Sequence, residues 1–199
     1  MTPAHRVLFA AAAILAVLAA VTGTSVPSTR GVIDAAALAR DIEHESDHVT
    51  GIELAEWIRS RKPGLRVIDV RPDSEYAAYH VPGAERRSLG ELAAMSPKGG
   101  ETLVLYSEGG AHAAQGWVLL RSLGFTNVYF LRGGLLEWMG DVMGPSLPDS
   151  SGNRGADSVR AHVAEISRYF GGVPRHGRAT DGADGSAREA VARVRRRGC

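Results

Sequence analysis

The chain has 199 residues, of which 44% are hydrophobic, and its formal net charge is +1. This length suits one domain with tails, the hydrophobic content excludes wholesale disorder, and the near-neutral charge argues against a nucleic-acid-binding protein. The charge is uneven, because residues 151–199 carry ten Arg and five Asp or Glu, a net of +5, which leaves −4 for residues 1–150. A basic end can contact phosphates or anionic lipids, and it also simply keeps a chain end soluble.

The N-terminus has the pattern of a targeting segment. Residues 1–6 are weakly basic, and residues 7–21 form an unbroken apolar run of 15 residues. A membrane-spanning helix needs about 20 residues, so this run has the length of a signal-peptide core. The small residues Val21 and Gly23 predict cleavage after residue 23, and the alternative is an uncleaved anchor over residues 7–26. Either alternative predicts an exported domain, periplasmic or secreted.

Helices and strands alternate from residue 34 onward. Asp34 is a candidate N-cap for a helix over Ala35–Glu45, and Thr50 is a candidate N-cap for a second helix that ends near Arg61. The apolar residues of the second helix share one face, so we expect that face to be buried.

Three short apolar runs, at residues 67–70, 103–106 and 128–131, predict buried parallel strands. Between the last two, apolar residues at helical spacing predict a helix over 113–123, and Gly124 follows where a C-terminal glycine belongs. The alternation predicts an α/β domain with a mainly parallel central sheet flanked by helices.

The composition changes after residue 143. Gly144–Asp157 is rich in Gly, Pro, Ser and Asp and predicts a loop. Apolar residues at helical spacing predict a short amphipathic helix over Ser158–Phe170 that docks on another surface. Residues 171–185 are again typical of a loop, and residues 186–197 predict a weak, basic and exposed terminal helix.

Four segments resemble the rhodanese-like (sulfurtransferase) domain superfamily in their order and spacing. They are Val67-Ile68-Asp69-Val70-Arg71, His80-Val81-Pro82-Gly83-Ala84, the strand and loop over 103–112, and residues 127–138, which include Arg132-Gly133-Gly134 and Trp138. The resemblance implies the organisation of the chain. We expect a signal peptide or anchor over 1–23, a linker and short helix over 24–48, a rhodanese-like domain over 49–143, and a basic, partly helical and partly disordered extension over 144–199.

The resemblance also implies chemistry at the loop that follows the central strand. In the family this loop runs Cys-x-x-Gly-x-Arg, and its inward-pointing backbone N–H groups and the next helix N-terminus favour a thiolate. That thiolate takes up a sulfane sulfur as a persulfide. The loop of this chain is Ser107-Glu108-Gly109-Gly110-Ala111-His112. Serine replaces the cysteine, histidine replaces the arginine, and Glu108 adds a negative charge.

These replacements predict that sulfur transfer at this loop is lost. A hydroxyl cannot hold a sulfane sulfur as a persulfide, and a neutral His112 does not replace an arginine as an anion ligand. A serine nucleophile with His112 as its base is disfavoured, because both lie in one tight loop without a third orienting group. The phosphatase relatives of the fold need the loop cysteine as well. What survives is a backbone cradle for a small oxyanion, or else a merely structural loop.

Two other features are alternatives to this interpretation. His44-Glu45-Ser46-Asp47-His48 matches the H-E-x-x-H pattern of zinc proteases, but it lies at a helix end and no third ligand follows, so we expect neither a metal nor a cofactor. Cys199 is the only cysteine, which excludes an internal disulfide. Neighbouring arginines would lower the pKa of its thiol and the terminal carboxylate would raise it. It is a candidate sulfur carrier, and the alternative is an exposed thiol at a chain end.

The sequence therefore predicts an exported rhodanese-like pseudoenzyme that acts as a binding or accessory module. One alternative is a thiosulfate sulfurtransferase that uses Cys199. Another is a scaffold that docks a partner protein or a membrane through its basic tail. We expect a small oxyanion or a partner protein as the ligand, no nucleic acid, and membrane contact only through the N-terminal anchor or weakly through the tail. Asp69 and Arg71 are expected to form structural polar contacts beneath the loop.

Overall fold

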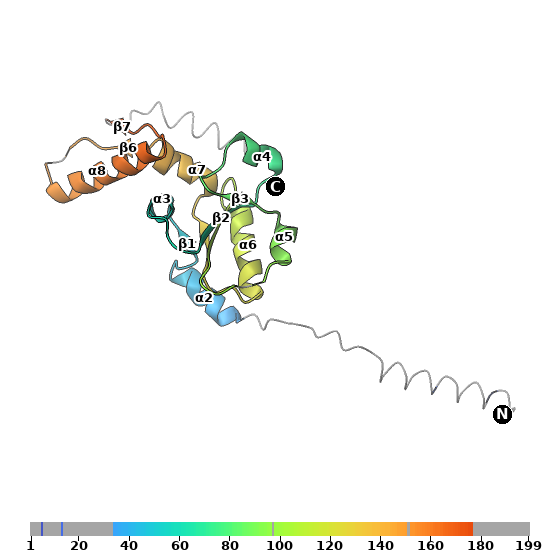
Figure 1. Cartoon of the computed structure of the whole chain (residues 1–199). Coiled ribbons are helices and arrows are strands. Elements are labelled where there is room, and N and C mark those ends of the chain that lie inside the picture. The colour runs from blue at the N-terminus through green and yellow to red at the C-terminus, as the bar shows by residue number, and fades with distance from the viewer. Residues whose placement is uncertain (1–4, 6–12, 14–33, 97, 151, 177–199) are drawn as a thin grey trace. The chain divides into compact units, whose positions relative to one another are not determined.

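The computed structural model describes residues 5, 13, 34–96, 98–150 and 152–176 (Figure 1). The expected signal segment (apart from residues 5 and 13), the expected helix over 186–197 and Cys199 lie outside the described residues. Among the helices of the described part of the chain, none is long and apolar enough to cross a membrane.

A five-stranded parallel sheet forms the centre of residues 34–176. Its order is β1-β5-β4-β2-β3. The strands are β1 (His48–Val49), β2 (Leu65–Asp69), β3 (Glu85–Arg86), β4 (Thr102–Tyr106) and β5 (Val128–Leu131). The three strands predicted from apolar runs are confirmed and take the three middle places. The edge strands β1 and β3 have two residues each, which is too short for a pattern to show in the sequence.

The central strand β4 is buried on both faces. Val104 and Tyr106 belong to one hydrophobic cluster, whereas Leu103 and Leu105 belong to a second cluster on the opposite face. A parallel strand that is covered on both sides must be apolar at every position, which explains the uninterrupted run.

The helices α5 (Leu89–Ala93) and α6 (Ala111–Ser122) cover one face of the sheet and lie beside each other in Figure 1. Trp117 of α6 is buried there, and its indole Nε1–H donates to the carbonyl oxygen of Val128 at 2.8 Å. This bond ties α6 to β5 and satisfies the one polar atom of the indole ring. The helix α2 (Ala35–Glu43) packs Leu38 against the same cluster, and Asp34 caps it as predicted.

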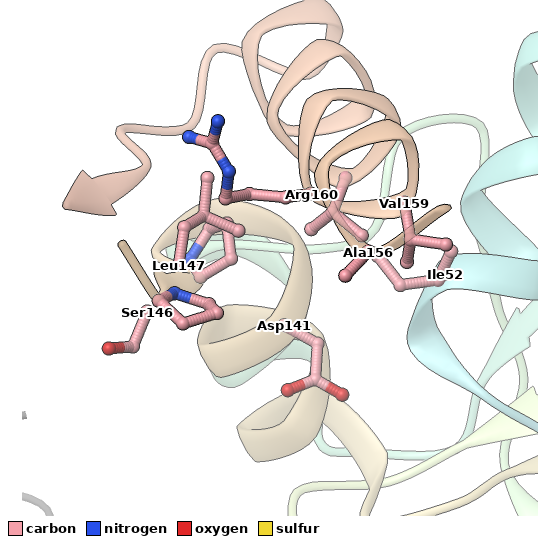
Figure 2. Close-up of a pocket in the computed structure, with 10 residues that line it drawn as sticks. Ile52, Asp141, Ser146, Leu147, Ala156, Val159 and Arg160 are labelled. Atoms are coloured by element: carbon pink, nitrogen blue, oxygen red, sulfur yellow. The ribbon is translucent and has the colours of Figure 1, made fainter. Parts of the chain in front are cut away.

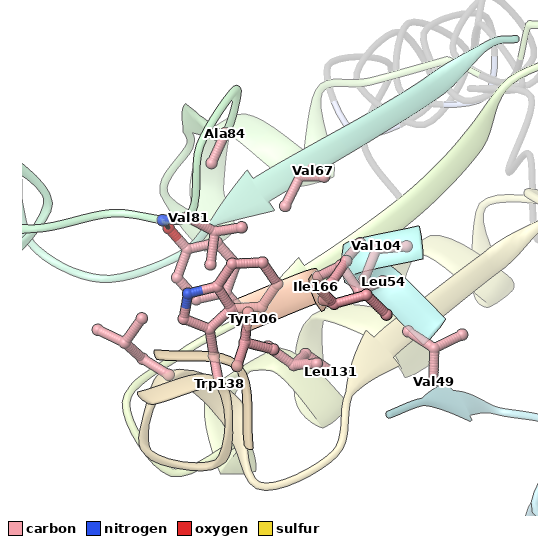
Figure 3. Packing of buried hydrophobic residues seen from close by; sticks show 13 residues of the cluster. Val49, Leu54, Val67, Val81, Ala84, Val104, Tyr106, Leu131, Trp138 and Ile166 are labelled. Carbon is pink, nitrogen blue, oxygen red and sulfur yellow. Dashed lines mark hydrogen bonds between the residues drawn. The ribbon is translucent and has the colours of Figure 1, made fainter. Parts of the chain in front are cut away.

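The other face is covered by α3 (Gly51–Arg59), α7 (Gly134–Trp138), the π-helix η1 (Met139–Met143) and α8 (Arg154–Tyr169). Figure 3 shows Trp138 beside Tyr106, and Ile166 of α8 near Leu54 and Val104. The ring of Phe170 meets that of Trp138 edge-on, with centroids 5.2 Å apart. The C-terminal helix is therefore part of the core of the domain.

The segment after η1 is more ordered than its composition predicts. The helix α8 begins at Arg154, four residues before the predicted start, because the Asn153 side chain accepts hydrogen bonds from the amides of Gly155 and Ala156. The predicted loops over 144–157 and 171–185 contain β6 (Ser146–Leu147) and β7 (Arg175–His176), which pair in parallel. The prediction of continuous loops was therefore wrong at these positions.

Candidate functional site

The loop singled out in the sequence lies at the carboxyl end of the central strand. Tyr106 ends β4, and α6 begins at Ala111, so Ser107–Gly110 make the whole connection. Gly110 is the N-cap of α6 and has a φ of +90°, a conformation that favours glycine. In parallel α/β sheets the carboxyl ends of the strands are where ligands bind, so this is the expected place for a site.

The Ser107 side chain is buried inside its own loop. The residue is only 3% exposed, and its Oγ accepts hydrogen bonds from the backbone N–H of Gly110 at 3.1 Å and of Ala113 at 3.4 Å. These are the amides that a cradle would offer to an anion. In this chain the serine hydroxyl is their partner.

The loop is held from the other side by α7. The amides of Leu135 and Leu136 donate to the carbonyl oxygens of Ser107 at 2.9 Å and of Glu108 at 3.1 Å. Gly134 makes this approach close enough, because a Cβ placed on it would lie 2.3 Å from the Ser107 carbonyl oxygen. The glycine pair at 133–134 therefore fixes the loop backbone.

Arg71 lies beneath the mouth of the loop and is 6% exposed. Its Nε donates to Oδ1 of the fully buried Asp69 at 3.0 Å, and its Nη2 donates to Oδ2 of Asp69 and to the Tyr79 carbonyl oxygen, both at 2.7 Å. Burial alone would lower the pKa of Arg71, but the hydrogen bonds and charge of Asp69 raise it above its usual value. The guanidinium is therefore permanently charged, and its remaining nitrogen, Nη1, contacts Oε2 of Glu108 at 3.3 Å.

A cavity of about 560 Å³ opens over the loop. Two arginines, two glutamates and one histidine line it, together with five further residues that are apolar or carry hydroxyls; the charged and histidine members are Arg71, Arg86, Glu75, Glu108 and His112. Arg86 is also paired, through Nε with Asp73 at 3.1 Å and through Nη1 with Glu91 at 3.3 Å. Both arginines of the cavity thus already have carboxylate partners.

Comparison with known proteins decides the family. The rhodanese-like domain model matches residues 52–141. Residues 52–141 are a rhodanese-like domain. Over 95 residues the chain is 34% identical to the probable adenylyltransferase/sulfurtransferase MoeZ of Mycobacterium tuberculosis, which covers 45% of this chain and 24% of that protein. It is also 34% identical over 113 residues to a tRNA uridine(34) hydroxylase of Anaplasma marginale, a match that covers 52% of this chain and 40% of that protein. The chain thus spans two fifths or less of these relatives.

Solved structures of single rhodanese-like domains are similar as well. The human single-domain sulfurtransferase TSTD1 matches with a TM-score of 0.43 and 29% identity, over 47% of this chain and 95% of that chain. The rhodanese-like domain of an Anabaena protein matches with a TM-score of 0.42 and 29% identity, over 46% and 72%.

The H-E-x-x-H segment does not form the arrangement of a zinc protease. In the H-E-x-x-H segment, His44 ends α2, Glu45 has a φ of +52° and His48 begins β1, so the two histidines do not share a helix. Within the described residues, groups of three or more His, Cys, Asp or Glu that could hold a metal are not found. Trp117 and Trp138 are core residues. Cys199 lies outside the described part of the chain.

Sequence reasoning identified the loop of the rhodanese-like domain but missed the arginine chemistry around it. Arg71 was expected to be structural, and its contact with Asp69 confirms this, but its second contact, with Glu108, was not predicted. Arg86 and Glu75 were not predicted as cavity residues at all. The register of β2 against β4 accounts for the contact between Arg71 and Glu108. Asp69 pairs with Tyr106 across β2 and β4, so residues 71 and 108 each follow the paired positions by two.

A second cavity, of about 510 Å³, lies between α3, η1, β6 and α8 (Figure 2). Most of its lining is apolar, and Asp141 and Arg160 are its ionisable members. Burial, and next the nearby charge of Glu137, raise the pKa of Asp141. The hydroxyl of Ser146 and the carboxylate of Asp141 are the oxygen-bearing side chains in its lining.

Proposed function

We propose that this chain is an exported rhodanese-like protein that does not transfer sulfur at its loop and acts as a binding or accessory module. The observation that carries the proposal is the state of Ser107. Its hydroxyl occupies the buried position where the family has its cysteine, and it accepts the hydrogen bonds of the Gly110 and Ala113 amides in place of a thiolate.

Sulfur transfer needs a nucleophile that accepts a sulfane sulfur and later acts as the leaving group when that sulfur is passed on. A cysteine thiolate attacks the outer sulfur of thiosulfate, the S–S bond breaks and sulfite departs with the electron pair. Cyanide then takes that sulfur as thiocyanate and returns the thiolate. A free thiol has a pKa of about 8.5, and such a loop lowers this pKa further. The serine hydroxyl stays protonated and offers no sulfur for a persulfide, so the first step does not occur.

The binding role is supported by what the loop keeps. The loop still joins a strand to a helix through Gly110. The cavity over it is open and is lined by Arg71 and Arg86. A side chain of a partner protein can enter this cavity without being turned over. The relatives named sulfurtransferase and tRNA hydroxylase match over only 24% and 40% of their own length, so their activities are not transferred to the chain.

A thiosulfate:cyanide assay tests the proposal. We expect no turnover above background for the wild type and for Cys199→Ser, and measurable thiocyanate formation for Ser107→Cys. The matched control is Ser88→Cys, which places a thiol on the same cavity but outside the loop, and it should stay inactive. Robust wild-type turnover that disappears in Cys199→Ser would overturn the proposal in favour of the terminal thiol.

Export is tested separately from chemistry. The full chain is expressed in a bacterial host, the periplasmic and membrane fractions are separated, and the intact mass of the recovered protein is measured. We expect a mature protein that begins at residue 24. Recovery of the full-length chain from the cytoplasm would contradict the export part of the proposal.

A further inference from the structure

We propose that Glu108 is an internal anion that sets the specificity of the loop cavity by occupying Arg71. This inference rests on the proposed function, because it explains how the cavity of a non-catalytic domain excludes anionic sulfur donors. It assigns a specificity role to a residue beside Ser107, independent of the serine itself.

The geometry of the Arg71 guanidinium carries the argument. Its Nε and Nη2 are committed to Asp69 and the Tyr79 carbonyl oxygen, at 2.7 to 3.0 Å. The remaining nitrogen, Nη1, donates to the Glu108 carboxylate at 3.3 Å. The carboxylate of Glu75 lies farther away, at 3.9 Å. An incoming oxyanion would therefore meet Glu108 in the place where it must bind.

The contact between Glu108 and Arg71 is not needed to hold the fold. Asp69 is fully buried and makes the structural ion pair, whereas the Glu108 side chain is 41% exposed and makes a single contact with Arg71. The Arg71 guanidinium is buried, but Asp69 already supplies its counter-charge, so the added contact with the partly exposed Glu108 carboxylate is not what keeps this charge paired. Because one face of Glu108 is in water, its carboxylate can move away when the charge beneath it is satisfied by another anion. The residue thus competes with ligands.

The remaining charges of the cavity add to this exclusion. Arg86 is already paired with Asp73 and Glu91. A divalent anion such as thiosulfate gains no uncommitted guanidinium in the described part of the cavity, and it meets the repulsion of Glu75 and Glu108 as well. A neutral ligand, or one with a cationic group, meets neither obstacle.

The test compares Glu108→Gln with the matched control Glu75→Gln. Both remove one negative charge from the same cavity, but only the first neutralises the side chain that accepts a hydrogen bond from Arg71. Thiosulfate and sulfate are titrated into each full-length protein and followed by the amide resonances of residues 107–113. We expect thiosulfate affinity to rise about tenfold in Glu108→Gln and about twofold in Glu75→Gln, because Glu108 is the nearer carboxylate and the one hydrogen-bonded to Arg71.

A kinetic readout separates this inference from the proposed function. In a Ser107→Cys background, adding Glu108→Gln should lower KM for thiosulfate about tenfold and leave kcat within about twofold, because Glu108 competes for binding without entering the chemistry. Equal gains for the Glu75 and Glu108 variants, or no gain for either, would overturn the inference. Wild-type turnover would overturn the proposed function and leave the comparison of the two glutamates intact.

Discussion

Replacing Gly134 by alanine tests how the loop is held. The glycine has a φ of +60°, and a Cβ on it would lie 2.3 Å from the Ser107 carbonyl oxygen, 2.6 Å from the Gly110 nitrogen and 2.7 Å from the Glu108 carbonyl oxygen. All three are backbone atoms, which cannot turn aside as a flexible side chain could. The left-handed conformation costs an alanine about 1–2 kcal/mol, and the overpacking adds about 1–3 kcal/mol. We expect Gly134→Ala to lower the free energy of unfolding by about 3 kcal/mol.

Gly83→Ala is the matched control for this prediction. Gly83 also has a positive φ, of +80°, but a Cβ there would meet nothing within 4 Å. It should therefore lose only the conformational term, about 1–2 kcal/mol. Urea unfolding followed by tryptophan fluorescence measures both variants, and the amide spectrum of residues 107–110 shows whether the loop has moved. If the two alanines cost the same and the loop amides of Gly134→Ala stay in place, the reasoning is refuted.

Three further substitutions test the frame around the site. Asp69→Asn leaves the buried Arg71 guanidinium without its counter-charge, so urea unfolding should show a loss of about 3–5 kcal/mol. Ile166→Ala removes a fully buried side chain of α8 and should lower the free energy of unfolding by about 2–5 kcal/mol. Val159→Ala, at a position that is 64% exposed on the same helix, should lower it far less. Equal losses would show that α8 is not part of the core. Ser107→Ala leaves two loop amides without their acceptor and should cost about 1–3 kcal/mol by the same measurement, and an unchanged midpoint would contradict the buried hydrogen bonds.

The sequence predicts the middle of the fold well because burial there acts on whole runs of residues. The strand β5 is confirmed at the predicted residues 128–131, and α6 with Gly124 as its C-terminal glycine is confirmed to within two residues. The two-residue strands could not be predicted in this way. The strands β6 and β7 lie on either side of α8 in the sequence and pair with each other. Their segments are rich in Gly, Pro and Ser, and this composition indicates a loop although the pairing orders them.

The candidate site likewise has features that the sequence predicts and features that it does not. Sequence resemblance located the loop and its serine, since these are consecutive residues with a recognisable pattern. The pairing of Arg71 with Glu108 joins residues 37 positions apart and depends on the register of β2 against β4. The paired state of Arg86 likewise depends on where α4 (Asp73–Ala78) and α5 place Asp73 and Glu91. No periodicity in the sequence encodes these distances.

The structure also explains how the loop keeps its shape while its side chains depart from the family pattern. Its backbone is fixed by the amides of α7 and by the conformation of Gly110, and neither uses the side chain at position 107. What position 107 must supply is an acceptor for the buried amides of Gly110 and Ala113, because unpaired buried donors are costly. Serine meets that requirement with a hydroxyl, as a cysteine would with a thiolate. The loop therefore retains its fold without its nucleophile, and Glu108 beside it decides which ligands can still enter.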